Sequence, residues 1–132
     1  MRYLDFGRTG LKVSELGFGG IPILRLAADE AVGILHRAFD RGMTLFDTAN
    51  AYATSEDKMG RAFAGRRDKI VLATKTMKRD AAGAAEHLEN SLRLLRTDYI
   101  DIYQLHQVSR EEDWRAIIGP GGAMEVLVRA RE

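Results

Sequence analysis

The 132-residue chain contains no cysteine. Disulfide bonds, zinc–thiolate sites and iron–sulfur clusters held by residues of this chain are therefore excluded. No apolar run approaches the roughly 20 residues that span a bilayer, and the opening MRYLDFGRTG lacks the apolar segment of a signal peptide. A net charge of only +1 gives no electrostatic reason to expect binding to nucleic acid or to an anionic membrane. We expect a cytoplasmic protein with no metal site.

What the chain does contain is typical of a soluble globular domain. Its residues are 45% hydrophobic and 30% charged, which is the usual balance for such domains. The length suffices for one domain with a hydrophobic core. Two short strand-like segments flank the turn GRTG, and they predict an antiparallel hairpin over residues 2–13.

Residues 14–132 alternate between strand and helix patterns. A brief strand is expected in SELGFGG, further strands over 43–47, 69–75 and 99–106, and helices over 29–41, 54–64, 80–96, 110–118 and from 123 onward. Ser109 and Glu112 have the spacing of a capping box for the fourth of these helices. Such alternation predicts βαβ units and a parallel sheet. The apolar run IVLA at 70–73 indicates a strand covered on both faces, which either a doubly wound sheet or a barrel would provide.

Ionisable residues stand at the ends of three expected strands. These are Asp47, Lys75 and His106. Ligands of parallel α/β proteins bind outside the carboxyl ends of the strands, and three successive strand ends span about 10 Å. Tyr52, in the loop after the first of these strands, can reach the same area. The sequence therefore predicts one small site.

These residue types together suggest proton transfer to a carbonyl oxygen. A free tyrosine has a pKa of about 10, and a neighbouring lysine ammonium brings the pKa of a phenol down. An aspartate paired with the lysine keeps a buried charge from standing alone, and a histidine opposite can orient a carbonyl or share the proton. The result is a general acid that protonates a carbonyl oxygen while another group delivers hydride.

Each residue also has a structural interpretation when it is taken alone. Asp47 could cap a helix or form a turn, Lys75 could be a solvated loop lysine, and His106 could be a structural histidine. Their shared place at strand ends favours the functional interpretation. Asp101 differs, because it lies inside an apolar strand where an unpaired charge is costly. We expect it to have a hydrogen-bonded structural partner.

The segments FDTANAY, LATK and DYIDIYQLH, with the opening GRTGLKVSELGFGGIP, resemble the signatures of the aldo-keto reductase family. The resemblance covers essentially the whole chain in order and spacing. It implies α/β structure in which parallel βα units form the N-terminal half of a TIM-type (β/α)8 barrel after a small hairpin. It also implies a catalytic tetrad at Asp47, Tyr52, Lys75 and His106. The expected reaction is reduction of an aldehyde or ketone to an alcohol, with NADPH or NADH as hydride donor.

The resemblance carries over only part of the cofactor site. Gly19, Gly20, Ile21 and Asp47 match cofactor contacts by position, whereas the family's main phosphate and adenosine contacts belong to the second half of the barrel. A complete barrel takes about 250 residues. We therefore expect residues 1–132 to form a single, incomplete domain, with the hairpin over 2–13 and βα units over 14–132. FGGIPI, QLHQVS and GPGGAMEVLVRA are similar to a branch whose longer members often carry an iron–sulfur region, which this cysteine-free chain lacks.

Two other functions compete with carbonyl reduction. One is a noncatalytic half-barrel that binds a partner or self-assembles. The other is a doubly wound flavin- or nucleotide-binding module, which is weakened because GFGG lacks the third glycine of the dinucleotide fingerprint. The expected partners are a small carbonyl substrate and, for the half-barrel, either a second copy of the chain or a complementing half.

Overall fold

A computed structural model describes residues 1–131, which contain two β-sheets. The first is an antiparallel hairpin of β1 (Tyr3–Asp5) and β2 (Lys12–Ser14). The second is a parallel sheet of four strands, β3 (Gly17–Gly19), β4 (Leu45–Asp47), β5 (Val71–Thr76) and β6 (Ile102–Leu105). The predicted hairpin and the predicted parallel sheet are both confirmed.

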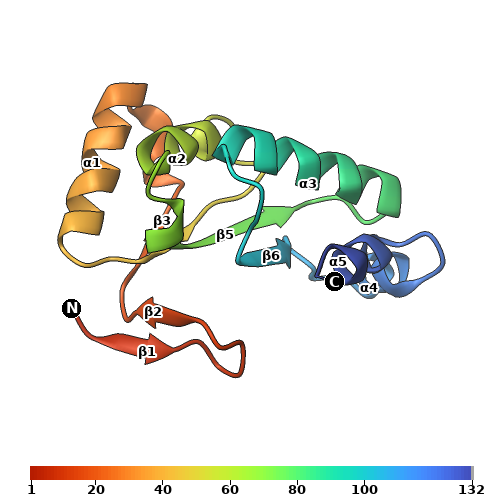
Figure 1. The fold of residues 1–132 in the computed structure, drawn as a ribbon. Helices are drawn as coiled ribbons and strands as arrows, with labels where there is room; N and C mark the ends of the chain where they lie inside the picture. Colours follow the sequence, from red (N-terminus) through yellow and green to blue (C-terminus); the bar gives the residue numbers. More distant parts are fainter. Residues whose placement is uncertain (132) are drawn as a thin grey trace.

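Five α-helices and two short 3-10 turns connect the strands. They are α1 (Ala28–Asp40), α2 (Ser55–Phe63), α3 (Ala81–Leu95), α4 (Glu111–Ile118), α5 (Ala123–Arg131), η1 (Pro22–Arg25) and η2 (Arg67–Lys69). In Figure 1, α1, α2 and α3 lie along one side of the parallel sheet, and α4 and α5 lie together beyond β6. Within residues 1–131, no helix combines the length and the apolar character needed to cross a membrane.

The order of the parallel strands decides between the two α/β architectures left open by the sequence. Neighbours in the sheet follow the chain, as β3-β4-β5-β6. A doubly wound sheet reverses direction at a switch point, and no reversal occurs among the described strands. Consecutive parallel strands with helices on the outer side form the wall of a barrel.

Aromatic residues at the centre of the core fix the helices against the sheet. Phe46 of β4 is fully buried, and its ring centroid lies 4.4 Å from that of Phe63 in α2. Burial of each such side chain contributes about 1.5–3 kcal/mol. Gly60 allows α2 to approach α3 closely, because a Cβ there would lie 2.2 Å from the carbonyl oxygen of Leu94. This packing sets where the strand ends lie.

The hairpin is attached at the amino-terminal end of the parallel sheet. The amide of Ser14 donates to Oγ1 of Thr44 and the amide of Thr44 donates to Oγ of Ser14, each over 2.9 Å. The Tyr3 hydroxyl donates to the carbonyl of Gly42 over 3.0 Å. Gly42 follows α1 with φ +92, a left-handed conformation that glycine adopts without steric cost. The carboxyl ends of the strands lie on the opposite side, away from the hairpin.

Several element boundaries differ from the predicted ones. The strand predicted at 69–75 spans 71–76, because residues 67–69 form η2, and the strand predicted at 99–106 is limited to 102–105. The prediction of a capping box at Ser109 and Glu112 is wrong. Arg110 occupies the N-cap position of α4 with no side-chain cap hydrogen bond, and Glu112 instead pairs with the Arg110 guanidinium over 2.7 Å. Glu112 therefore forms an ion pair with Arg110 in place of the reciprocal cap expected with Ser109.

Asp101 has the structural partners that its apolar surroundings predict. Its Oδ2 accepts hydrogen bonds from the backbone amide of Leu72 over 2.8 Å and from Nη2 of Arg67 over 2.6 Å. The Arg67 guanidinium also lies 3.9 Å from the ring centroid of Tyr99. The side chains of Asp101 and Arg67 are only 14% and 13% exposed. The carboxylate thus joins the segment before β6 to β5.

Replacement of Asp101 tests this assignment. Asp101→Ala leaves the Leu72 amide without its acceptor and removes the charge opposite Arg67, so it should lower the free energy of unfolding by about 1–3 kcal/mol. Chemical denaturation measures the loss. The matched control is Asp98→Ala in the same segment, because Asp98 is exposed and should change stability by less than about 0.5 kcal/mol. Equal losses in both variants would contradict a structural role for Asp101.

Candidate active site

The parallel strands bring the three ionisable strand-end residues to one edge of the sheet. Asp47 is the last residue of β4, Lys75 is the penultimate residue of β5, and His106 follows β6 directly. Lys75 pairs with Gln104 in the register of β5 and β6, and Asp47 pairs with Ala73. The prediction that these residues lie together at the carboxyl edge is consistent with this register.

Lys75 has two acceptors for its ammonium group. Its Nζ donates to Oδ1 of Asp47 over 2.5 Å and to the carbonyl of Thr48 over 2.6 Å. The Lys75 side chain is 14% exposed, whereas Asp47 is 38% exposed. A largely buried ammonium requires this compensation, since an unpaired charge away from water is costly. The pair is therefore anchored on the Lys75 side and open to solvent on the Asp47 side.

Tyr52 lies in a turn directly before α2. Its amide donates to the carbonyl of Ala49, and its own carbonyl accepts from the amide of Ser55. The amide of Asn50 donates to the carbonyl of Lys75 over 3.0 Å. The loop therefore remains next to β5 after β4 has ended at Asp47. Local turn hydrogen bonds and this link between strands fix where the phenol points.

The Tyr52 side chain completes a group of four residues. Its hydroxyl lies 3.4 Å from Nε2 of His106, and the two rings meet edge to face at 79° with centroids 5.4 Å apart. Nζ of Lys75 lies 5.3 Å from the Tyr52 ring centroid, within the range of cation–π attraction. The structure brings together all four residues that the sequence singled out. A 3.4 Å separation is long for a hydrogen bond.

The imidazole of His106 lies in surroundings that disfavour its protonation. Burial lowers the pKa of His106 below its ordinary value, and the positive charges of Lys75 and Arg79 lower this pKa further. Asp47 acts in the opposite direction. The buried Nδ1 of His106 has no hydrogen-bond partner among residues 1–131. Burial and the two positive charges therefore favour the neutral form of the ring that faces Tyr52.

A chain of buried hydroxyl groups holds the neighbouring strands together. Oγ1 of Thr48 donates to Oγ of Ser55 over 2.9 Å, and Oγ of Ser55 donates to the carbonyl of Gly20 over 3.0 Å. The amide of Gly20 donates to the carbonyl of Asp47 over 2.7 Å. A Cβ at Gly20 would lie 2.3 Å from Oγ of Ser55. Glycine is needed at position 20 for this close packing between the β3 loop and α2.

The other residues matched to cofactor contacts lie at the rim beside Asp47. Gly19 is opposite Asp47 in the β3–β4 register, and a Cβ built on Gly19 would meet no atom within 4 Å. Ile21 is 55% exposed. Open space therefore adjoins the exposed carboxylate, and the backbone at Gly19 can be approached closely. The Cβ position of Gly20, in contrast, is filled by packing.

Two contributors to the site were missed by the sequence analysis. One is the carbonyl of Thr48, a main-chain group whose role has no signal in residue type. The other is Glu56, only 1% exposed, whose Oε1 accepts from Oγ1 of Thr74 over 2.7 Å and whose Oε2 accepts from Nδ2 of Asn50 over 3.5 Å. In the sequence, Glu56 looks like an ordinary acidic residue in the first turn of a helix. Its burial follows from the packing of α2 against β5.

Comparison with known proteins identifies the family. Residues 15–130 match the model of the aldo/keto reductase family. The chain belongs to this family. It is 38% identical to the aldo-keto reductase YhdN of Bacillus subtilis, over 80% of this chain and 38% of that protein. This assignment confirms the resemblance inferred from the sequence motifs.

Solved aldo-keto reductases have the same fold. The structure of the aldo-keto reductase AKR11C1 from Bacillus halodurans superposes with a TM-score of 0.79 at 32% identity, covering 98% of this chain and 47% of that one. The structure of an aldo-keto reductase from Klebsiella pneumoniae in complex with NADPH gives a TM-score of 0.74 at 30% identity, covering 92% and 44%. The described strands and helices thus correspond to the N-terminal part of an aldo-keto reductase barrel. The chain spans less than half the length of these relatives.

Opposite changes at Lys75 and Asp47 should shift the pKa of His106 in opposite directions. Lys75→Met removes a positive charge and should raise this pKa, whereas Asp47→Asn removes a negative charge and should lower it. NMR titration of the imidazole resonances measures both shifts. His36 and His87 are the only other histidines in the 132 residues, and they give the remaining imidazole signals in the same spectra. Shifts of the same sign at His106 would contradict the electrostatic arrangement described above.

Proposed function

We propose that these residues carry the proton-transfer machinery of an NAD(P)H-dependent reductase that converts the carbonyl group of an aldehyde or ketone to an alcohol. In this proposal Tyr52 is the general acid that donates its hydroxyl proton to the carbonyl oxygen. A hydride adds to the carbonyl carbon, and the C=O double bond becomes a C–O single bond bearing the proton from Tyr52. The phenolate left on Tyr52 takes its next proton from water or a neighbouring group.

The observation that carries the proposal is the position of the Tyr52 hydroxyl. It lies 3.4 Å from Nε2 of His106, and Nζ of Lys75 lies 5.3 Å from the Tyr52 ring centroid. A fixed ammonium beside a phenol stabilises the negative charge that develops on its oxygen as the proton leaves. The Lys75 charge is held in place by Asp47 and by the Thr48 carbonyl. This combination supports acid catalysis more strongly than a structural role for each residue alone.

His106 has the role of orienting the carbonyl in this proposal. A neutral imidazole whose Nε2 carries the proton can donate a hydrogen bond to the same oxygen that Tyr52 protonates. The lowered pKa of His106 supports the neutral form at physiological pH. Asp47 would hold Lys75 and, through its exposed oxygen, face the cofactor.

In this proposal a nicotinamide cofactor binds at the rim beside Asp47. Such a cofactor supplies the hydride, and Gly19, Ile21 and Asp47 would hold its ring end, with Gly20 as the packed residue between them. The open position at Gly19 beside the exposed carboxylate supports this fit. The Klebsiella pneumoniae relative was solved with NADPH, which favours NADPH over NADH. The contacts for the phosphates and the adenosine would come from barrel strands outside residues 1–132.

A noncatalytic half-barrel is the second candidate function. The observation that favours it is the edge of the sheet, since β3 and β6 each pair with only one strand within the described residues. Unpaired parallel edges are templates for association with another chain. We propose that residues 1–132 are one incomplete domain whose barrel is closed by further strands. Those strands would come from the same polypeptide, from a second copy or from a complementing half.

Replacement of Tyr52 tests the catalytic proposal directly. In the catalytically active form of the protein, Tyr52→Phe removes the acid and should lower kcat for aldehyde reduction by about 100-fold or more, with the affinity for NADPH nearly unchanged. Steady-state kinetics and cofactor fluorescence measure the two quantities. The matched control is Tyr99→Phe, because Tyr99 is an exposed tyrosine before β6 that lies against Arg67 rather than His106. Wild-type turnover in Tyr52→Phe would refute the role given to Tyr52.

A polypeptide of residues 1–132 produced alone should associate or remain loosely packed. The residues of β5 are almost fully covered, but those of β6 are partly exposed and both outer strands keep a free edge. Each 100 Å² of apolar surface left in water forgoes about 2.5 kcal/mol of stabilisation, which is a large share of the net stability of a domain. Light scattering measures the association, and fluorescence titration should detect little binding of NADPH. A compact monomer that binds NADPH with micromolar affinity would contradict this expectation.

A further inference from the structure

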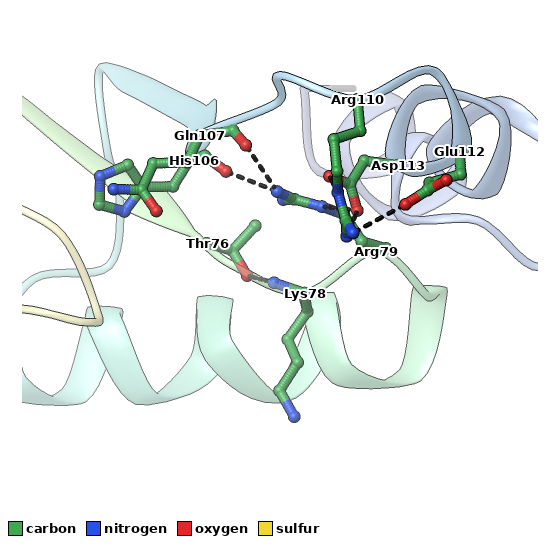
Figure 2. Close-up of polar contacts among 8 residues, drawn as sticks. All are labelled: Thr76, Lys78, Arg79, His106, Gln107, Arg110, Glu112 and Asp113. Atoms are coloured by element: carbon green, nitrogen blue, oxygen red, sulfur yellow. Dashed lines mark hydrogen bonds and ion pairs between the residues drawn. The ribbon is translucent and has the colours of Figure 1, made fainter.

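Arg79 connects the segment after β5 to the loop that carries His106. Its Nη2 donates to the carbonyl of His106 over 2.8 Å and to the carbonyl of Gln107 over 3.2 Å, and its Nε lies 3.5 Å from Oδ1 of Asp113 in α4 (Figure 2). The Arg79 side chain is 18% exposed. One guanidinium thus joins the ends of β5 and β6 and the start of α4.

The imidazole of His106 lacks the usual support for its orientation. Functional histidines are commonly oriented by a hydrogen bond at the ring nitrogen that does not face the substrate. Within residues 1–131 the buried Nδ1 of His106 has no such partner. Its backbone, in contrast, is hydrogen-bonded at both the amide and the carbonyl. The His106 amide donates to the carbonyl of Thr76 over 2.9 Å, and its carbonyl accepts from Arg79.

The residue after His106 has a backbone conformation that needs external support. Gln107 has φ +53, in the left-handed region where a residue with a side chain is strained. Such a strained conformation persists only where the surrounding structure imposes it. Arg79 binds the Gln107 carbonyl as well as that of His106. The same side chain therefore stabilises the turn that sends the chain away from β6 and leaves His106 facing Tyr52.

The charges around Arg79 fit a structural clamp better than a free anion site. Asp113 pairs with Arg79 and also with Arg110, and Glu112 pairs with Arg110. Two cations thus face two carboxylates. Arg79, Arg110 and Asp113 line a hollow of about 560 Å³ together with Met77, Gln107 and Ser109. Both guanidinium groups already have carboxylate partners, Asp113 for both and Glu112 for Arg110.

We propose that Arg79 is a positioning residue for carbonyl reduction, which holds the His106 imidazole against Tyr52 by binding the backbone carbonyls of His106 and Gln107. The inference rests on the function proposed above. Arg79 makes no hydrogen bond or ion pair with Tyr52, Lys75 or Asp47 within the described residues. Its effect on the reaction passes through His106.

Three variants test the proposal in the catalytically active protein. Arg79→Gln removes both the clamp and a nearby positive charge, so kcat should fall about 10-fold or more because a small displacement of a reacting group is costly. The pKa of His106 should rise in the same variant, since Arg79 lowers it. Arg79→Lys keeps the charge but reaches fewer carbonyls, so kcat should fall while the pKa of His106 stays near the wild-type value. Arg110→Gln removes a guanidinium from the same ion-pair cluster, but Arg110 pairs with Asp113 and Glu112 rather than with the carbonyls of His106 and Gln107, so kcat should stay within about 2-fold.

Steady-state kinetics and NMR titration of the histidines distinguish the outcomes. A rise in the pKa of His106 in Arg79→Gln but not in Arg110→Gln, together with the loss of kcat, supports the proposal. Equal effects of Arg79→Gln and Arg110→Gln, or an unchanged His106 titration in folded Arg79→Gln, would overturn it. Should Arg79→Gln fail to fold, Arg79→Lys decides, because wild-type kcat in that variant is incompatible with a clamp. Full activity of Tyr52→Phe would remove the proposed function, whereas a shifted His106 titration in Arg79→Gln would still establish the link between the two residues.

Discussion

The ammonium group of Lys75 is held largely out of water, and the rest of the site is arranged around that constraint. Asp47 supplies one acceptor and the carbonyl of Thr48 supplies the other. Thr48 is positioned because its amide bonds to the carbonyl of Ala73, which extends the β4–β5 ladder past the end of β4. A shift between β4 and β5 would separate the charge from both acceptors and leave it buried without compensation. The pairing of the Lys75 charge with its acceptors therefore depends on the register between β4 and β5.

The hydrophobic core supplies the force that keeps this register. Phe46 is fully buried among the helices, and the next residue, Asp47, points to the opposite face of the same short strand. Gly60 brings α2 close to α3, and α2 in turn presents Ser55 and the preceding turn with Tyr52. A strand of only three residues has little hydrogen bonding of its own, so side-chain packing on one face decides where the polar group on the other face lies.

The sequence predicted those parts of the structure that depend on side-chain type at regular positions. Asp47, Lys75 and His106 could be found because strand ends share an edge, and Tyr52 because a short loop limits its reach. Strand lengths were less predictable. The strand predicted from residue 99 begins only at Ile102, and the residue before it, Asp101, bonds to distant Arg67. Three contributors had no local signal. The Thr48 carbonyl is a main-chain atom, Glu56 is buried only because the fold places it against Thr74 and Asn50, and Arg79 resembles any solvated loop arginine until the fold brings it to the His106 loop.

Arg79 and Asp113 also tie the surroundings of His106 to pH. The hydrogen bond from Arg110 holds the pKa of Asp113 below its usual range, while burial and the charges of Lys75 and Arg79 hold the pKa of His106 below its ordinary value, with Asp47 acting in the opposite direction. A proton on the imidazole is therefore opposed by Lys75 and Arg79, whereas a proton on Asp113 would weaken its ion pairs with Arg79 and Arg110. Acid thus acts on this loop in two chemically distinct ways, as charge added beside Tyr52 and as charge lost at the start of α4.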